Sequence, residues 1–199
     1  MQTRLSTQER QAEIVAAALQ LARGCSPALI TTGDIASAIG VTQGAVFKHF
    51  ATKDAIWLAT LRWVHTALLQ ALEAAAAGAA TPRDALCAMF RAHVGFVIAH
   101  PGVPRLIFHE LQQPQDSPVK QEVRALLQAY RRLLRDGRGP AVARGQARAD
   151  LDLDAAATTF VGLVQGLVMQ SMLGGRAEAM RAPSERVLAL YLRTLGVAP

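Results

Sequence analysis

Aromatic residues make up only 5% of this 199-residue chain, and it has two cysteines. Cys25 and Cys87 lie far apart and belong to no Cys-x-x-Cys or Cys/His ligand spacing, which excludes a zinc site and a disulfide framework. No stretch reaches the roughly 18 uninterrupted apolar residues of a membrane span. The N-terminus lacks the basic start and apolar run of a signal peptide. These absences predict a soluble, cytoplasmic protein without a metal site or a membrane partner.

Motifs of catalysis are also missing. The chain has no nucleophile elbow, phosphate loop, His-Glu-x-x-His or paired-carboxylate spacing. A helical enzyme built on His93, His100 or His109 therefore has nothing to support it. We expect no catalytic residues and no cofactor.

The charge of the chain is basic but unevenly distributed. The net charge is +6 and the isoelectric point about 10.1, which favours an anionic partner such as nucleic acid. Residues 1–62 hold six Lys and Arg against four acidic residues, whereas 83–148 hold eleven against five. The Arg-rich run from Tyr130 to Arg148 is more typical of a solvated helix face than of a binding surface.

Strand patterns are scarce and helical spacing recurs throughout, which predicts an all-α fold. Apolar residues at three- and four-residue spacing predict a first helix from Thr7 to Ala22, ended by Gly24. Two short helices follow around Gly40, and another runs from about Lys53 towards Ala77. Glycine- and proline-containing breaks then delimit five longer helices, at about 82–100, 102–113, 116–137, 152–173 and 183–196.

The segment from Thr32 to Phe50 has the spacing of a helix-turn-helix. Ala36 is small enough for two helices to approach closely, Gly40 supplies the positive φ of a tight turn, and Val46 packs back on the first helix. Ile35 and Ile39 complete its inner face. The same spacing also occurs in a short helix pair that merely packs, so by itself it leaves that alternative open.

The second helix of this pair has the residues of a reading head. Thr42 is placed as its N-cap, which leaves Gln43, Gly44, Ala45, Lys48 and His49 exposed. Gln pairs with an adenine edge, while Gly and Ala permit close approach to bases and thymine methyl groups. We expect Lys48, His49 and Lys53 to meet phosphates, and Gln43 and Ala45 to carry sequence preference.

Across residues 9–62 the chain resembles the DNA-binding head of the TetR family, through ITTGDIASAIGVTQGAVFKHFATKDAIW, with its His49-Phe50 pair, Lys53 and Asp54. The resemblance implies that Gln43, Gly44, Ala45, Lys48 and His49 face the groove or its walls. It also implies that Thr32 and Thr42 cap helices beside phosphates and that Lys53 contacts the backbone of operator DNA. Phe47 replaces the usual Tyr, which removes one hydroxyl contact to phosphate, and Gly33 offers no side chain.

The resemblance implies a two-domain organisation: residues 1–62 form the three-helix DNA-binding head, and residues 63–199 form a helical domain for effector binding and dimerisation. In such proteins the last two helices build a four-helix bundle across a two-fold axis. The residues expected at that interface are Phe160, Gly162, Leu163, Val164, Gly166 and Leu167 on the first of these helices and Val187, Leu188, Tyr191, Leu192 and Leu195 on the second. The alternative is that these faces pack only inside one chain.

A small-molecule pocket is expected among the middle helices. Its candidate lining residues are Phe90, His93, Val94, Val97, Arg105, Phe108, His109 and Met169, although plain core packing is the simpler explanation for each apolar one. The predicted function is a ligand-released transcriptional repressor that acts as a homodimer. The alternative is a DNA-binding regulator without a small-molecule effector.

Overall fold

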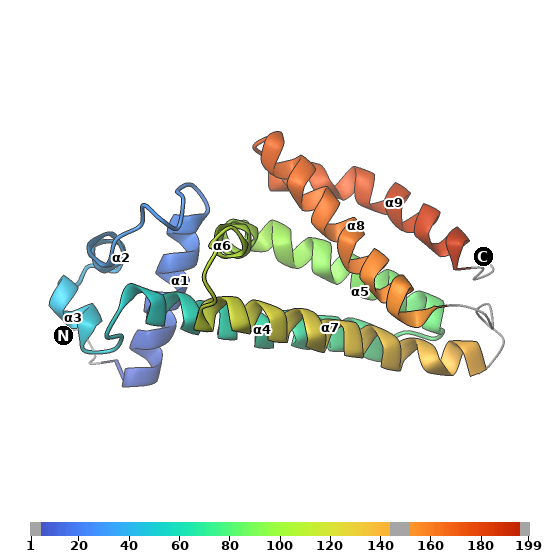
Figure 1. Ribbon diagram of the computed structural model, residues 1–199, viewed down its shortest axis with the longest axis horizontal. Coiled ribbons are helices and arrows are strands. Elements are labelled where there is room, and N and C mark those ends of the chain that lie inside the picture. Colours follow the sequence, from blue (N-terminus) through green and yellow to red (C-terminus); the bar gives the residue numbers. More distant parts are fainter. Residues whose placement is uncertain (1–4, 144–151, 196–199) are drawn as a thin grey trace. The chain divides into compact units, whose positions relative to one another are not determined.

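The computed structural model describes residues 5–143 and 152–195, and these residues form helices and no strand. The elements follow the order drawn in Figure 1: α1 (Thr7–Ala22), α2 (Thr32–Ala38), α3 (Gln43–Phe47), α4 (Lys53–Ala77), α5 (Pro82–Ala99), α6 (Gly102–Leu111), α7 (Pro118–Ala143), α8 (Leu153–Leu173), η1 (Ala177–Met180) and α9 (Arg181–Thr194). The all-α prediction is confirmed.

Most helix boundaries agree with the sequence to within two residues. The exception is α7, which was expected to end near Gly137 but continues to Ala143. A proline removes one backbone donor, and near the C-terminal end of a long helix that loss interrupts only the last turn. The Gly-Arg-Gly-Pro sequence therefore does not end this helix where the pattern predicted.

The chain divides into two compact units. One contains Met1–His65 and His100–Arg124, and the other contains Thr66–Ala99 and Ala125–Pro199. The N-terminal unit thus includes α6 and the start of α7 besides the head, because α6 packs on α1. Both α4 and α7 contribute residues to each unit. The division of the sequence at residues 62 and 63 stays a prediction.

In the N-terminal unit, α1 buries Ile14, Ala18 and Ala22 on one face. Helix α6 approaches this face so closely that a Cβ on Gly102 would overlap the Leu19 carbonyl oxygen and lie 3.1 Å from the Ala22 methyl group. Only glycine fits this contact without moving a backbone. Gly102 therefore fixes the distance between α1 and α6.

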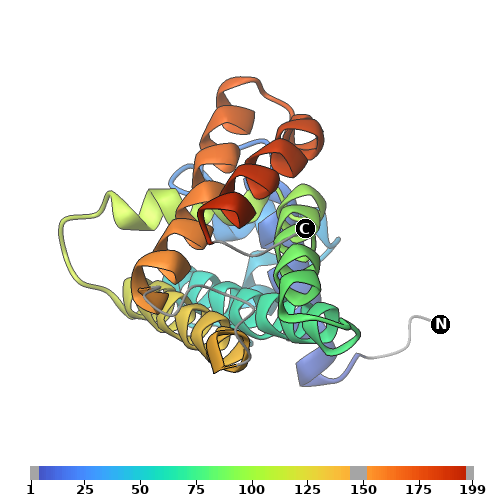
Figure 2. The same cartoon turned by 90° about the vertical axis from the view of Figure 1, so that its right-hand side faces the viewer.

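In the C-terminal unit, α8 packs against α5 and α9 (Figure 2). Its centre is an aromatic cluster in which Phe160 of α8 contacts Phe90, Tyr130 and Tyr191 edge-on, with ring centroids 5.4, 6.2 and 5.7 Å apart. The Tyr191 hydroxyl donates a 2.6 Å hydrogen bond to the Ala156 carbonyl, which fastens α9 to α8. The few aromatic residues of this unit are concentrated in its core.

Helix α8 is long and apolar enough to cross a membrane by length and composition, with a mean hydropathy of 1.3 in its best window. The core helix of a folded unit passes the same test. About 44% of that window is buried against neighbouring elements of this chain, including Phe160, Val164 and Leu167. This burial accounts for part of its apolar character.

Candidate DNA-binding surface

The helix-turn-helix is held by small buried residues and one left-handed turn residue. Gly40 has φ of 67°, and the Val41 amide donates back to the Ala36 carbonyl at 3.0 Å. Ala36 and Val46 are buried, with 2% and 0% exposure. The predicted roles of Ala36, Gly40 and Val46 are therefore confirmed.

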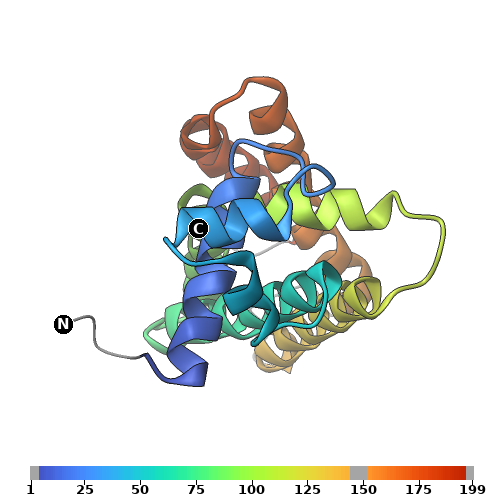
Figure 3. The ribbon, with the colours of Figure 1, turned by 90° about the vertical axis from the view of Figure 1, so that its left-hand side faces the viewer.

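Helix α3 presents an exposed face (Figure 3). Thr42 caps it, since its hydroxyl accepts the Ala45 amide at 3.2 Å as predicted. Gln43, Gly44 and Lys48 are exposed, and the Phe47 ring is 46% exposed. Ala45 is half-buried.

The prediction that Thr32 caps α2 is wrong. The N-cap is Thr31, whose hydroxyl accepts the Asp34 amide at 3.1 Å while the Asp34 carboxylate accepts the Thr31 amide at 2.8 Å. The amide and then the hydroxyl of Thr31 both donate to the Asp34 carboxylate, which lowers the pKa of Asp34. The Thr-x-x-Asp spacing was a readable signal for this capping box.

Thr32 instead lies in the first turn of α2 and is buried. Its hydroxyl accepts a hydrogen bond of 2.6 Å from the Gln43 side-chain amide. This bond joins the two helices of the helix-turn-helix through the residue expected to read a base. The buried Thr32 thereby holds the Gln43 side chain from within the protein.

Lys53 is not free to bind phosphate in this structure. Its ammonium group donates to the carbonyl oxygens of Pro27, Ala28 and Ile30 at 3.4, 3.1 and 3.1 Å. An ammonium has three donors, so these carbonyls occupy all of them. Here Lys53 joins the start of α4 to the segment between α1 and α2, and its contact with the DNA backbone stays a prediction.

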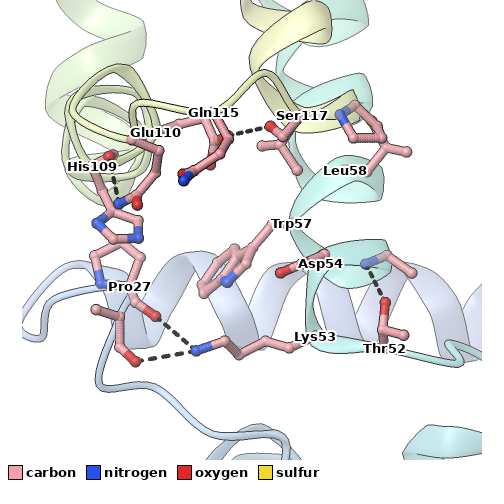
Figure 4. Close-up of a pocket in the computed structure, with 15 residues that line it drawn as sticks. Pro27, Thr52, Lys53, Asp54, Trp57, Leu58, His109, Glu110, Gln115 and Ser117 are labelled. Carbon is pink, nitrogen blue, oxygen red and sulfur yellow. Dashed lines mark hydrogen bonds between the residues drawn. The ribbon is translucent and has the colours of Figure 1, made fainter.

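The hydrogen bonds of Lys53 lie at the border of an open cleft of about 680 Å³ (Figure 4). Trp57 of α4 and His109 and Glu110 of α6 line it together with Lys53. Glu110 is buried and accepts the Ser117 hydroxyl, which holds the α6–α7 connection. The cleft thus separates the start of α4 from the end of α6 within the N-terminal unit.

His49 follows α3 and is half-buried. Its carbonyl accepts a 3.3 Å hydrogen bond from the side chain of Gln11 on α1, and its Nδ1 atom is buried without a partner. No local pattern pointed to Gln11, because contacts between polar residues distant in the chain leave no periodic signal. The backbone after α3 is thereby attached to α1.

The residues predicted to line an effector pocket fall into both units. Phe90, Val94 and Val97 of α5 are buried in the C-terminal unit, where Nδ1 of His93 lies 2.9 Å from the Tyr130 hydroxyl. Burial lowers the pKa of His93 to about 4, so the ring is neutral at neutral pH.

The other predicted pocket residues do not join that group. Arg105, Phe108 and His109 lie on α6 in the N-terminal unit. Met169 is 56% exposed on α8, so its assignment to an interior pocket is corrected. Helical periodicity could not tell which face of α8 is covered, because that helix is apolar almost all round.

The same ambiguity affects the residues proposed for dimerisation. Those buried within the single chain are Phe160, Val164, Leu167, Leu188, Tyr191, Leu192 and Leu195. Gly162 and Gly166 are exposed as expected, with open space where a Cβ would stand. The large exposed apolar residues nearby are Met169 and Leu173 of α8 and Leu190 of α9. The exposed face of α8 therefore keeps Gly162 and Gly166 of the predicted set and adds Met169 and Leu173.

The fold and the surface of α3 define a helix-turn-helix DNA-binding regulator. Residues 14–60 match the family of bacterial regulatory proteins of the tetR type, and residues 110–186 match the tetracyclin repressor-like C-terminal domain. The chain belongs to the TetR family of transcriptional regulators, which are DNA-binding proteins and not enzymes.

Individual relatives agree with this assignment. The chain is 28% identical over 190 residues to the HTH-type transcriptional regulator BetI of Rhizobium meliloti (strain 1021), covering 94% of this chain and 91% of BetI. Among solved structures, FadR from Bacillus subtilis, in complex with stearoyl-CoA, has a TM-score of 0.80 at 19% identity and covers 90% of this chain and 96% of FadR. A regulator from Saccharomonospora viridis in complex with choline has a TM-score of 0.78 at 19% identity, with 94% and 96% covered. These two structures share the fold.

Proposed function

We propose that this protein is a homodimeric repressor that binds operator DNA through α3 and leaves it when a small molecule binds the C-terminal unit. The observation that carries the DNA-binding half is the exposed face of α3, with Gln43, Gly44, Phe47 and Lys48 accessible behind a capped N-terminus. Gln43 and Ala45 would meet base edges, and Lys48 and His49 would meet phosphates. Family members are typically intracellular, and we place this one in the cytoplasm.

Two copies would join through the exposed stripe of α8, with Leu190 of α9 beside it. Gly162, Gly166, Met169 and Leu173 recur at three- and four-residue spacing, so they lie on one helix face. The glycines permit close approach of a second helix, and Met169 and Leu173 are 56% and 80% exposed. Exposed apolar side chains of this size are commonly covered by a partner. A two-fold dimer also sets two reading helices about one DNA turn, or ~34 Å, apart.

The effector would bind at the polar pair formed by His93 and Tyr130. These groups lie among Phe90 and Phe160, so the surroundings are apolar and aromatic with one hydrogen-bonding position. That combination suits a small apolar or aromatic molecule that carries a single polar group. The relatives solved with stearoyl-CoA and with choline support a ligand site in this fold without specifying this chain's ligand.

Release would follow from a shift of α4 and α6. Gly102 holds α6 against α1, and Lys53 holds the start of α4 against the segment before α2. A movement of either helix is therefore transmitted to the elements that carry α3. Because ligand shifts a pre-existing equilibrium, the effector must bind the released form more tightly. Trp57 and Trp63 on α4 are placed to report this movement.

The test uses the full-length protein with duplexes selected from a random pool. Choline, stearoyl-CoA and then a metabolite library are screened by thermal shift, and compounds that raise the Tm are titrated into the DNA complex. We expect at least one compound to raise the Tm, release the DNA and change tryptophan fluorescence. DNA binding with no stabilising compound would favour the alternative of a regulator without an effector. Release without any fluorescence change would refute the movement of α4.

A further inference from the structure

The C-terminal unit has a second feature, which lies on its surface between α5 and α9. It is an open cleft of about 610 Å³, lined by Arg83, Asp84, Cys87, Arg91, Glu185, Leu188, Ala189, Leu192 and Arg193. A volume of this size is within the range of small-molecule sites. None of these residues belongs to the His93–Tyr130 pair.

At one end of the cleft, the charges of the lining side chains cancel in an ion pair within the protein. Both Nε and an Nη of Arg91 donate to the two carboxylate oxygens of Glu185 at 2.8 Å, a bidentate pair that links α5 to α9. This bond lowers the pKa of Glu185 and raises that of Arg91. Both carboxylate oxygens of Glu185 therefore accept hydrogen bonds from Arg91.

The other end carries two arginines with no such partner. Arg83 precedes Arg91 by eight residues on α5, and Arg193 follows Glu185 by eight residues on α9. Because α5 and α9 run antiparallel (Figure 1), Arg83 and Arg193 lie at the same end of the cleft. Among the described residues neither has a carboxylate partner, and the Nε–H of Arg83 is buried without an acceptor. The nearby Asp84 carboxylate accepts the Thr81 hydroxyl at 2.7 Å as part of the α5 cap. A buried guanidinium N–H without an acceptor is costly, and an anion bound at this end would satisfy it.

The position of Arg83 strengthens this conclusion. It stands in the first turn of α5, where the helix dipole is positive and a cation is disfavoured. An anion placed there interacts favourably with the helix end and with both arginines. Between the two ends, Cys87, Leu188 and Leu192 provide an apolar floor. The site therefore combines a cationic end with an apolar floor.

We infer that this cleft binds a small anionic amphiphile, with its carboxylate or phosphate at Arg83 and Arg193 and its short alkyl chain along Leu188 and Leu192. Carboxylate and phosphate share the geometry that guanidinium groups recognise. The inference does not depend on DNA binding or on the interior effector site.

Cys87 serves as a reporter, because its half-buried thiol lies in the cleft floor. A Cys25→Ser variant leaves it as the single thiol, and its alkylation rate by iodoacetamide is measured against octanoate and octyl phosphate below their micelle concentrations. We expect saturable protection, at least threefold at saturation, with the stronger of the two anions identifying the preferred headgroup. Octyltrimethylammonium has the same chain with the opposite charge and should not protect.

The variants Arg83→Met and Arg193→Met should each raise the apparent Kd at least tenfold. Arg132→Met, which removes an exposed charge on α7 outside the cleft, should leave it unchanged. Circular dichroism verifies that each variant is folded. Equal protection by the cation, unchanged protection in both cleft variants, or no protection by either anion would overturn the inference. A labelling rate that depends only on protein concentration would overturn it too, because a second copy would then cover the cleft.

Discussion

The side-chain amide of Gln43 donates a hydrogen bond of 2.6 Å to the hydroxyl of Thr32, eleven residues earlier in the chain. This bond uses one of the two N–H donors of the Gln43 amide and leaves the second N–H and the carbonyl oxygen for a base. An acceptor in the major groove recognises the exocyclic amino group of adenine or cytosine. We therefore expect Thr32 to position Gln43 for a base contact.

Replacement of Gln43 tests this role first. Gln43→Ala should weaken binding to the preferred duplex by about 1–3 kcal/mol and relax preference at one base pair of each half-site. Thr32→Val should cost about 1 kcal/mol of the same specific affinity, since it frees Gln43 without removing it. The control is the double variant, in which Thr32→Val should add nothing to the loss from Gln43→Ala. Additive losses, measured by fluorescence anisotropy, would show that Thr32 acts independently.

Lys53 and Lys48 form a matched pair for separating structure from phosphate contact. Lys53→Met removes donors to three carbonyls, and the free energy of unfolding should fall by about 1–3 kcal/mol. The slope of log affinity against log salt should stay as in the parent. Lys48→Met should leave stability unchanged and reduce that slope by about 1.8, because each copy of the dimer loses one phosphate contact. A reduced slope of log affinity against log salt in Lys53→Met would show that Lys53 does contact phosphate, as the sequence predicted.

Gly102 and Gly95 differ in the space available for a methyl group. Gly102→Ala should destabilise the protein by about 1–3 kcal/mol, because the added Cβ overlaps backbone atoms of α1. Gly95 lies inside α5 with no atom within 4 Å of a Cβ, so Gly95→Ala should stabilise by up to about 1 kcal/mol. Urea unfolding of both variants measures the contrast. If Gly102→Ala were as stable as the parent, the close approach of α1 and α6 would be refuted.

His93 gives a pH dependence with a definite sign. Its folded-state pKa of about 4 lies below the ordinary 6.5, so between these values the unfolded chain binds the proton more tightly. The stability contributed by neutral His93 is complete above pH 6.5 and is lost as the pH falls towards 4. The slope is at most about 1.4 kcal/mol for each pH unit. His93→Gln, which keeps a hydrogen-bonding side chain but does not titrate, should flatten the unfolding profile in that window; an unchanged profile would contradict the burial of this ring.

Local signals predicted much of this architecture. The bounds of α1 and α4, the turn at Gly40 and the cap at Thr42 depend on residues adjacent in the chain, so their patterns could be read directly. The exposure of Gln43, Gly44 and Lys48 followed from the same geometry.

Contacts between distant residues could not be read in this way. The engagement of Lys53 with three carbonyls and the pairing of Thr32 with Gln43 depend on how segments pack, and a lysine near DNA-facing helices looks the same in either role. On α8, apolar residues occur on all sides, so periodicity gave no means of separating Phe160, which is core, from Met169, which is exposed. A face hidden by folding and a face meant for a partner have the same composition.

The central claim is that two copies of α3 read double-stranded DNA, with Gln43 outward. The most direct measurement is selection of binding duplexes from a random pool by the full-length protein at low ionic strength, followed by the same selection with Gln43→Ala. The account predicts a palindromic site with half-site centres about one helical turn apart, and loss of preference at one symmetric base-pair position in the variant. No enriched duplex, or an identical site from both proteins, would contradict it.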